Sequence, residues 1–79
     1  MIHDELQDIM RRVFNNPDLA ISDDMNADDV ENWDSLTHIN LVIEVEKHFE
    51  TKFKNAEIAR LQCIGDFKAL IRKKRPELG

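Results

Sequence analysis

The 79-residue sequence contains few of the residues that cross-link or interrupt a chain: one cysteine, two glycines and two prolines. Because Cys63 has no second cysteine to pair with, an intramolecular disulfide is excluded and a cysteine-based zinc site is disfavoured. We expect Cys63 to be a small buried residue rather than a reactive thiol. The scarcity of glycine and proline favours long regular segments. No segment alternates apolar and polar residues with a period of two, so strands are not predicted.

Long apolar runs are also missing. No stretch approaches the roughly 18 consecutive apolar residues that cross a bilayer. The first residues, Met1 to Glu5, show no basic segment followed by an apolar run, so we predict no signal peptide. These absences lead us to expect a cytoplasmic protein without a membrane span. A chain of 79 residues predicts one domain, residues 1–79, which is too small for a deep catalytic cavity.

Basic residues are absent from residues 18–34, although acidic residues gather there. The acidic residues of this segment are Asp18, Asp23, Asp24, Asp28, Asp29, Glu31 and Asp34. Together with the formal net charge of −5, they repel nucleic acid and anionic membranes and favour basic partners. The same composition is also typical of a loop that its charges simply keep soluble.

Apolar residues recur at three- and four-residue intervals in three segments, which predicts three longer helices. They cover residues 2–14, 35–50 and 64–74, and a shorter helix is expected over 56–61 with Asn55 as its cap. The sequence thus predicts an all-α protein, a small four-helix bundle with a long acidic loop between its first two helices. The apolar residues of that loop are expected to anchor it to the core, and they are Leu19, Ile21, Met25, Val30 and Trp33.

The second predicted helix has more apolar surface than an outer helix of a bundle needs. Leu41, Val42, Val45 and Phe49 fall on one arc, and Leu36, Ile39 and Ile43 extend that arc beyond half the circumference. An exposed apolar strip next to charged residues is typical of a partner surface. The alternative is that this helix is the central, most buried one.

Ser35 stands where the acidic loop becomes this helix. The candidate chemistries for it are nucleophilic catalysis, calcium binding and covalent attachment of a phosphate-linked group. A hydrolase would pair it with His38, but an orienting acid and a G-x-S-x-G elbow are missing, so a surface histidine is favoured. A calcium loop starting at Asp24 would need glycine at Asp29 and glutamate at Ser35, so no metal site is predicted. Covalent attachment of a phosphate-linked group suits a serine at a helix N-terminus.

The residues around Ser35 resemble the Asp-Ser-Leu helix of acyl carrier proteins. The matching residues are Asp34-Ser35-Leu36, Ile39, Leu41-Val42, Glu46 and Phe49. The resemblance covers almost the whole chain, since the order of an initial helix, an acidic loop, the Asp-Ser-Leu helix, a short helix and a closing helix is that of the family. Asp34 or Ser35 is also a suitable helix cap.

This resemblance implies a carrier rather than an enzyme. Ser35 would carry a 4′-phosphopantetheine arm, transferred from coenzyme A by a magnesium-dependent phosphopantetheinyl transferase, and Asp34 would support that transfer. The arm would hold acyl or aminoacyl groups as thioesters, passed between acyl-activating and acyl-transferring enzymes. Leu36, Ile39 and Ile43 match positions that meet partner enzymes, and Glu44 and Glu46 would help to contact their basic patches. The protein is expected to be a monomer.

The sequence departs from the common fatty-acid-synthesis form of the family. A glycine-containing approach to Asp-Ser-Leu is replaced by Glu31-Asn32-Trp33, and Thr37, Asn40 and Lys47 stand where acids are usual. These departures favour a specialised carrier serving one pathway. Two alternatives are an aminoacyl or peptidyl carrier and an unmodified helical interaction module.

Overall fold

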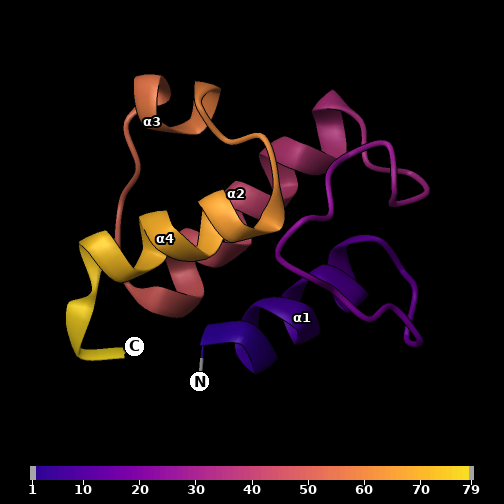
Figure 1. The fold of residues 1–79 in the computed structure, drawn as a ribbon, viewed down its shortest axis with the longest axis horizontal. Coiled ribbons are helices and arrows are strands. Elements are labelled where there is room, and N and C mark those ends of the chain that lie inside the picture. The colour runs from indigo at the N-terminus through magenta and orange to yellow at the C-terminus, as the bar shows by residue number, and fades with distance from the viewer. Residues whose placement is uncertain (1, 79) are drawn as a thin grey trace.

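The computed structural model describes residues 2–78, and every regular element in that range is helical (Figure 1). The elements are α1 (Ile2–Val13), α2 (Ser35–Phe49), α3 (Asn55–Ala59), α4 (Ile64–Lys74) and the 3-10 helix η1 (Pro76–Leu78). The predicted all-α class is confirmed, with three longer helices and one short one. The prediction of α3 is wrong at both ends. Its cap position is Lys54, whose N–H donates to the Glu57 carboxylate, and the helix ends at Ala59, so that Leu61 lies beyond it.

A single apolar core lies where α1 packs against α2 and α4. α1 buries Ile2, Leu6, Ile9 and Met10, α2 buries Leu41, Val42, Val45 and Phe49, and α4 buries Ile64, Phe67, Leu70 and Ile71. Each set recurs at helical spacing, so one face of each helix points inward. The segment between α2 and α3 adds Phe53, which meets Phe67 edge-on with ring centroids 6.0 Å apart.

The loop between α1 and α2 is fixed by its own apolar residues, as predicted. Leu19, Ile21 and Val30 are buried, and Met25 and Trp33 pack partly buried against the core. α1 also binds the loop backbone, because Arg11 Nε donates to the Leu19 carbonyl at 2.7 Å. A loop of this length is unusual in a small domain, and these anchors hold it against α1.

The same loop is docked onto the start of α4. The N–H groups of Ile64 and Gly65 donate to the carbonyls of Met25 and Asp23, each at 2.8 Å. The nearly buried Lys68 completes the contact through an ion pair with Asp23 and a hydrogen bond to His3. This arrangement gives the first turn of α4 the acceptors that helix N-termini otherwise lack.

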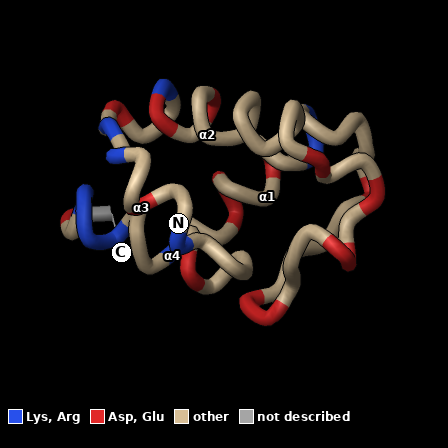
Figure 2. Tube along the Cα trace, turned by 90° about the horizontal axis from the view of Figure 1, so that it is seen from above, with Lys and Arg blue, Asp and Glu red and all other residues tan. Residues whose placement is uncertain are grey.

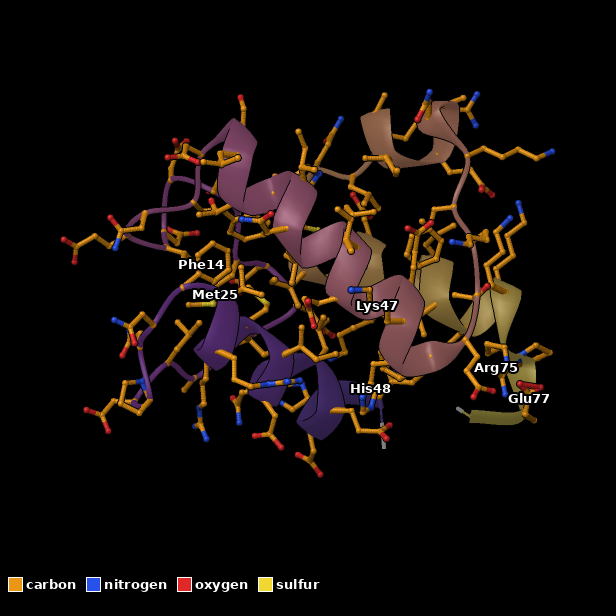
Figure 3. All side chains as sticks on the ribbon, turned by 180° about the vertical axis from the view of Figure 1, so that it is seen from behind. Phe14, Met25, Lys47, His48, Arg75 and Glu77 are labelled. Carbon is orange, nitrogen blue, oxygen red and sulfur yellow. The ribbon has the colours of Figure 1, made fainter. Side chains whose placement is uncertain are left out.

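Charge is distributed unevenly along the molecule. Acidic residues mark the loop between α1 and α2, whereas Lys and Arg gather mainly at the opposite end, where α4 finishes (Figure 2). There Arg75 lies beside Glu77 and donates to the carbonyl of Phe49 at the end of α2 (Figure 3). A cation at this position satisfies a carbonyl that the helix leaves unpaired.

Candidate functional site

The start of α2 is fixed by a reciprocal pair of hydrogen bonds between Asp34 and Thr37. The Thr37 N–H donates to Asp34 Oδ1 at 3.0 Å, and the Asp34 N–H donates to Thr37 Oγ1 at 2.8 Å. The Thr37 hydroxyl donates in turn to the Asn32 carbonyl at 2.7 Å. This is a capping box, which confirms Asp34 as the cap. The hydrogen bond from the Thr37 N–H is the main cause that lowers the pKa of Asp34.

Asn32 adopts a left-handed backbone conformation two residues before the cap. Its φ is 70°, in a region that favours glycine and that asparagine tolerates better than most residues. Asn32 can therefore make the bend before Asp34 without a glycine. This accounts for one of the departures noted in the sequence, the absence of glycine from Glu31-Asn32-Trp33.

Ser35 is the first residue of α2 and is exposed. Neither its hydroxyl nor its backbone N–H makes a hydrogen bond to another described residue. The Asp34 cap takes the N–H of Thr37 and leaves the N–H of Ser35 open at the positive end of the helix. The serine is thus presented to solvent by a rigid helix start.

Three large apolar side chains of α2 are exposed, in line with the prediction of an exposed strip. Leu36 is 68% exposed, Ile39 57% and Ile43 41%, and no other large apolar side chain of the described residues is exposed. The alternative, that this helix is the central and most buried one, is wrong, because α2 buries only the opposite arc. The strip begins directly after Ser35 and runs along the helix.

The two acids assigned to the partner surface are only half exposed. Glu46 accepts a hydrogen bond from the Phe53 N–H at 2.9 Å, so its carboxylate also holds the segment that follows α2. Glu44 lies beside Arg12 and Val13 at the edge of a surface groove. The contact of both acids with a partner stays a prediction.

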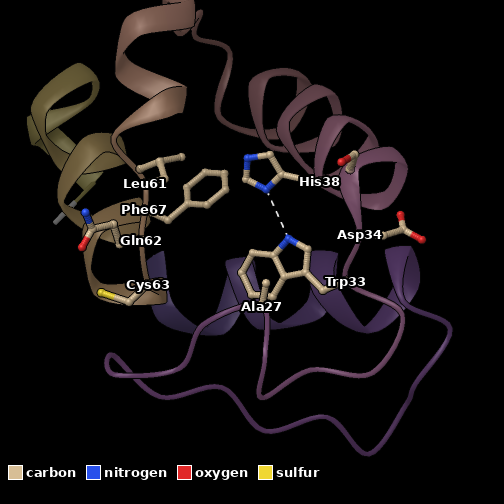
Figure 4. Close-up of a pocket in the computed structure, with 9 residues that line it drawn as sticks. Ala27, Trp33, Asp34, His38, Leu61, Gln62, Cys63 and Phe67 are labelled. Carbon is tan, nitrogen blue, oxygen red and sulfur yellow. Dashed lines mark hydrogen bonds between the residues drawn. The ribbon is translucent and has the colours of Figure 1, made fainter.

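A cavity of about 370 Å³ opens beside Ser35, between the start of α2 and the segment that joins α3 to α4 (Figure 4). Its lining includes Trp33, Asp34, Ser35, His38, Leu61 and Phe67. Sequence periodicity did not indicate this cavity, because Trp33 and Leu61 lie outside the helices. Cys63 also lines it and is half-buried rather than buried, which corrects the prediction for that residue.

His38 is the functional candidate that the sequence placed wrongly. It was predicted on the surface, but it is half-buried and its ring stacks on Trp33 with centroids 6.1 Å apart. The Trp33 Nε1–H donates to His38 Nδ1 at 3.2 Å. Burial lowers the pKa of His38, since the cationic form loses hydration there. His38 is half-buried because it packs on the Trp33 indole, which precedes α2. The spacing of residues within α2 gives no sign of this contact.

Across residues 2–78, no cluster of three or more His, Cys, Asp or Glu side chains is arranged to hold a metal ion. Within the same range, no helix combines the length and apolar character needed to cross a membrane.

Comparison with known proteins places this geometry in a family. The family described as "Phosphopantetheine attachment site" matches residues 4–71. The solution structure of a holo acyl carrier protein from Geobacter metallireducens is 34% identical and superposes with a TM-score of 0.90, covering 98% of this chain and 88% of that one. No curated protein sequence matches the chain.

A second solved structure supports the fold alone. A putative acyl carrier protein from Mycobacterium tuberculosis is 19% identical, with a TM-score of 0.79, covering 87% of this chain and 92% of that one. The fold and the exposed serine at the start of α2 define a small helical carrier domain. The chain belongs to the family of phosphopantetheine attachment domains. The cofactor of this family is 4′-phosphopantetheine.

Proposed function

We propose that this protein is an acyl carrier protein that bears its 4′-phosphopantetheine arm on Ser35. The observation that carries the proposal is the exposed Ser35 hydroxyl at the first position of α2, in a chain of the phosphopantetheine attachment family. The 34% identity to a holo acyl carrier protein over nearly the whole chain supports acyl groups as the cargo. When bound, the arm supplies a thiol that holds acyl groups as thioesters.

The residues at the start of α2 fit the phosphodiester of such an arm. An open N–H at Ser35 and the positive end of α2 suit an anionic oxygen. Asp34 is ionised at neutral pH, as an exposed aspartate is, and the hydrogen bond from the Thr37 N–H lowers its pKa further. An ionised carboxylate next to Ser35 would support a magnesium-dependent transfer, since hard cations prefer oxygen ligands.

The exposed strip of α2 would be the docking surface for the phosphopantetheinyl transferase and for acyl-activating and acyl-transferring enzymes. Leu36 and Ile39 lie within one turn of Ser35, so an enzyme that reaches the arm also reaches them. The acidic loop, with Glu44 and Glu46, would attract basic patches on these enzymes. The carrier itself would act as a monomer and perform no catalysis.

Intact mass measurement tests the proposal. The protein is incubated with coenzyme A, magnesium and a promiscuous phosphopantetheinyl transferase, together with a carrier of known competence. We expect a gain of one phosphopantetheinyl group that is lost in Ser35→Ala. Ser22→Ala is the matched control, because Ser22 is the chain's other serine and lies in the acidic loop. An unmodified protein beside a fully modified control carrier would contradict the proposal.

A further inference from the structure

The hydrogen bond from Trp33 determines which nitrogen of His38 carries a proton. Because the indole N–H donates to Nδ1, that nitrogen must be the acceptor in the neutral ring. The proton of neutral His38 therefore resides on Nε2. Burial lowers the pKa of His38, so this neutral form is present at neutral pH.

The Nε2–H is a donor without a partner. Among the described residues, His38 makes no hydrogen bond other than the one from Trp33. Its ring extends from α2 across the cavity toward Phe67 and Leu61 (Figure 4). These two side chains offer no acceptor, and Nε2 itself reaches solvent, so an acceptor that a ligand brings can meet it.

The cavity is continuous with the proposed attachment site, because Ser35 and Asp34 form part of its lining. A group tethered to Ser35 therefore has this open cavity directly beside its attachment point. The remaining wall combines the apolar side chains of Ala27, Trp33, Leu61 and Phe67 with the polar side chain of Gln62 and with Cys63. The His38 ring lies toward the apolar part of this wall, at Leu61 and Phe67 (Figure 4), where a single polar group can fix the orientation of a ligand.

We propose that His38 is a specificity-determining residue, whose Nε2–H binds a carbonyl oxygen of the group tethered to Ser35. The inference rests on the proposed function, since it requires the arm. The carbonyl has two sources, an amide of the arm itself or an oxygen near the thioester in the cargo. In the second case the carrier favours oxygen-bearing acyl groups, such as 3-oxoacyl groups, over plain alkanoyl groups.

Thermal unfolding of four forms of the protein tests this inference. The forms are apo, holo, octanoyl and 3-oxooctanoyl, each verified by intact mass and each made in wild type, His38→Phe and His38→Gln. Phenylalanine keeps a ring without an N–H. Glutamine keeps an acceptor for Trp33 and a donor for the cavity, so it should behave as wild type does.

We expect one of two His38-dependent differences. If the cargo supplies the acceptor, the 3-oxooctanoyl form melts about 4 °C above the octanoyl form in wild type and His38→Gln but not in His38→Phe. If the arm supplies it, a rise of similar size separates holo from apo in the same two proteins. Comparing each rise in melting temperature between wild type and His38→Phe cancels the effects of cargo hydrophobicity that do not involve His38.

A direct readout accompanies the melting curves. In 15N-labelled protein, the Nε2–H signal of His38 should become protected from solvent exchange in the form that carries the acceptor. The role of His38 would be overturned if the arm is attached normally, the melting-temperature differences are the same in wild type and His38→Phe, and the Nε2–H signal is not protected. The proposed function would stay intact in that case. Failure of Ser35 to take up the arm would overturn both.

Discussion

Thr37 shows how a single side chain can serve the site without touching a partner. In the sequence it stood out because a neutral residue replaces an acid that would contact partner enzymes. In the structure its hydroxyl joins Asn32 to Asp34, and its N–H binds the Asp34 carboxylate. The residue therefore connects the last turn of the loop to the first turn of α2, which holds Ser35 in place.

Replacing Thr37 with valine should lower the stability of the protein by about 1 kcal/mol, because the hydroxyl of the capping box is lost while the shape is kept. Chemical denaturation monitored by circular dichroism measures the change. Thr37→Ser retains the hydroxyl and should stay close to wild type. Equal stability of the valine and serine variants would show that the hydrogen bonds of the Thr37 hydroxyl contribute nothing.

His38 should make the stability of the protein depend on pH. Burial lowers its pKa below the usual value near 6.5, so the unfolded chain takes up a proton on His38 more readily than the folded chain. Stability is fully present above pH 6.5 and falls as the pH decreases below it. Protonation also removes the acceptor for the Trp33 N–H.

Denaturation curves between pH 5 and 8 check this dependence. We expect His38→Gln to lose much of the decrease below pH 6.5 and to match wild type at pH 8, because glutamine can accept from Trp33. His48→Gln is the control, because it removes an exposed histidine of the same helix, one that pairs with Glu5 instead of Trp33. If the stability of His38→Gln falls with decreasing pH as steeply as that of wild type, His38 is not the origin of the pH dependence.

At the scale of elements, α2 divides into two arcs with different tasks. Leu41 and Val45 are fully buried in the core, whereas Leu36 and Ile39 are mostly exposed. The exposed arc contributes little to folding because its side chains stay in water in the native state. This leaves it available for contact with other proteins.

Leu36→Asp should therefore change the free energy of unfolding by no more than about 0.5 kcal/mol, while Leu41→Ala should cost about 2–5 kcal/mol. In the transferase assay, Leu36→Asp should slow modification of Ser35, since the strip adjoins it. Circular dichroism melting and the rate of mass gain are measured on the same samples. A large loss of stability in Leu36→Asp, or an unchanged rate, would contradict the assignment of the strip.

The docking of the acidic loop onto α4 is a second feature of this scale. At Gly65 an added Cβ would lie 3.0 Å from the carbonyl oxygen of Asp23 and 3.3 Å from its Cβ. The backbone at Asp23 would have to move, and it is held there by the Gly65 N–H and by Lys68.

Gly65→Ala should destabilise the protein by roughly 1 kcal/mol, although alanine is the better helix former. Hydrogen exchange should show faster opening of the loop around Asp23 in this variant. Ala69→Gly, on the exposed side of α4, is the opposite control and should lower helix propensity without affecting the loop. A stabilised Gly65→Ala protein with unchanged loop exchange would refute the close contact.

At the scale of the whole molecule, helical periodicity was sufficient for the fold. The stripes of α1, α2 and α4 are local patterns, and the loop anchors Leu19, Ile21 and Val30 were correctly taken as buried. The cavity beside Ser35 was not predictable in this way. It depends on Trp33 and Leu61 coming together from segments without regular spacing, and on the tertiary contact that buries His38. Contacts of this kind have no signature in a single sequence.

The charge distribution links the fold to the proposed task. The acidic loop leads directly into Asp34 and Ser35, and the basic end of α4 lies at the other end of the molecule (Figure 2). In the proposed function, a basic enzyme surface would therefore be drawn toward the serine and the exposed strip rather than toward the C-terminal end.

Identifying the modified residue by mass spectrometry tests whether Ser35 carries the phosphopantetheine arm. After treatment with coenzyme A, magnesium and the transferase, the protein is digested and its peptides are fragmented in the mass spectrometer. We expect the phosphopantetheinyl group to reside on the peptide containing Asp34-Ser35-Leu36, with fragment ions that assign it to Ser35. A phosphopantetheinyl group on Ser22 or on any other residue, or the absence of a modified peptide, would contradict attachment to Ser35.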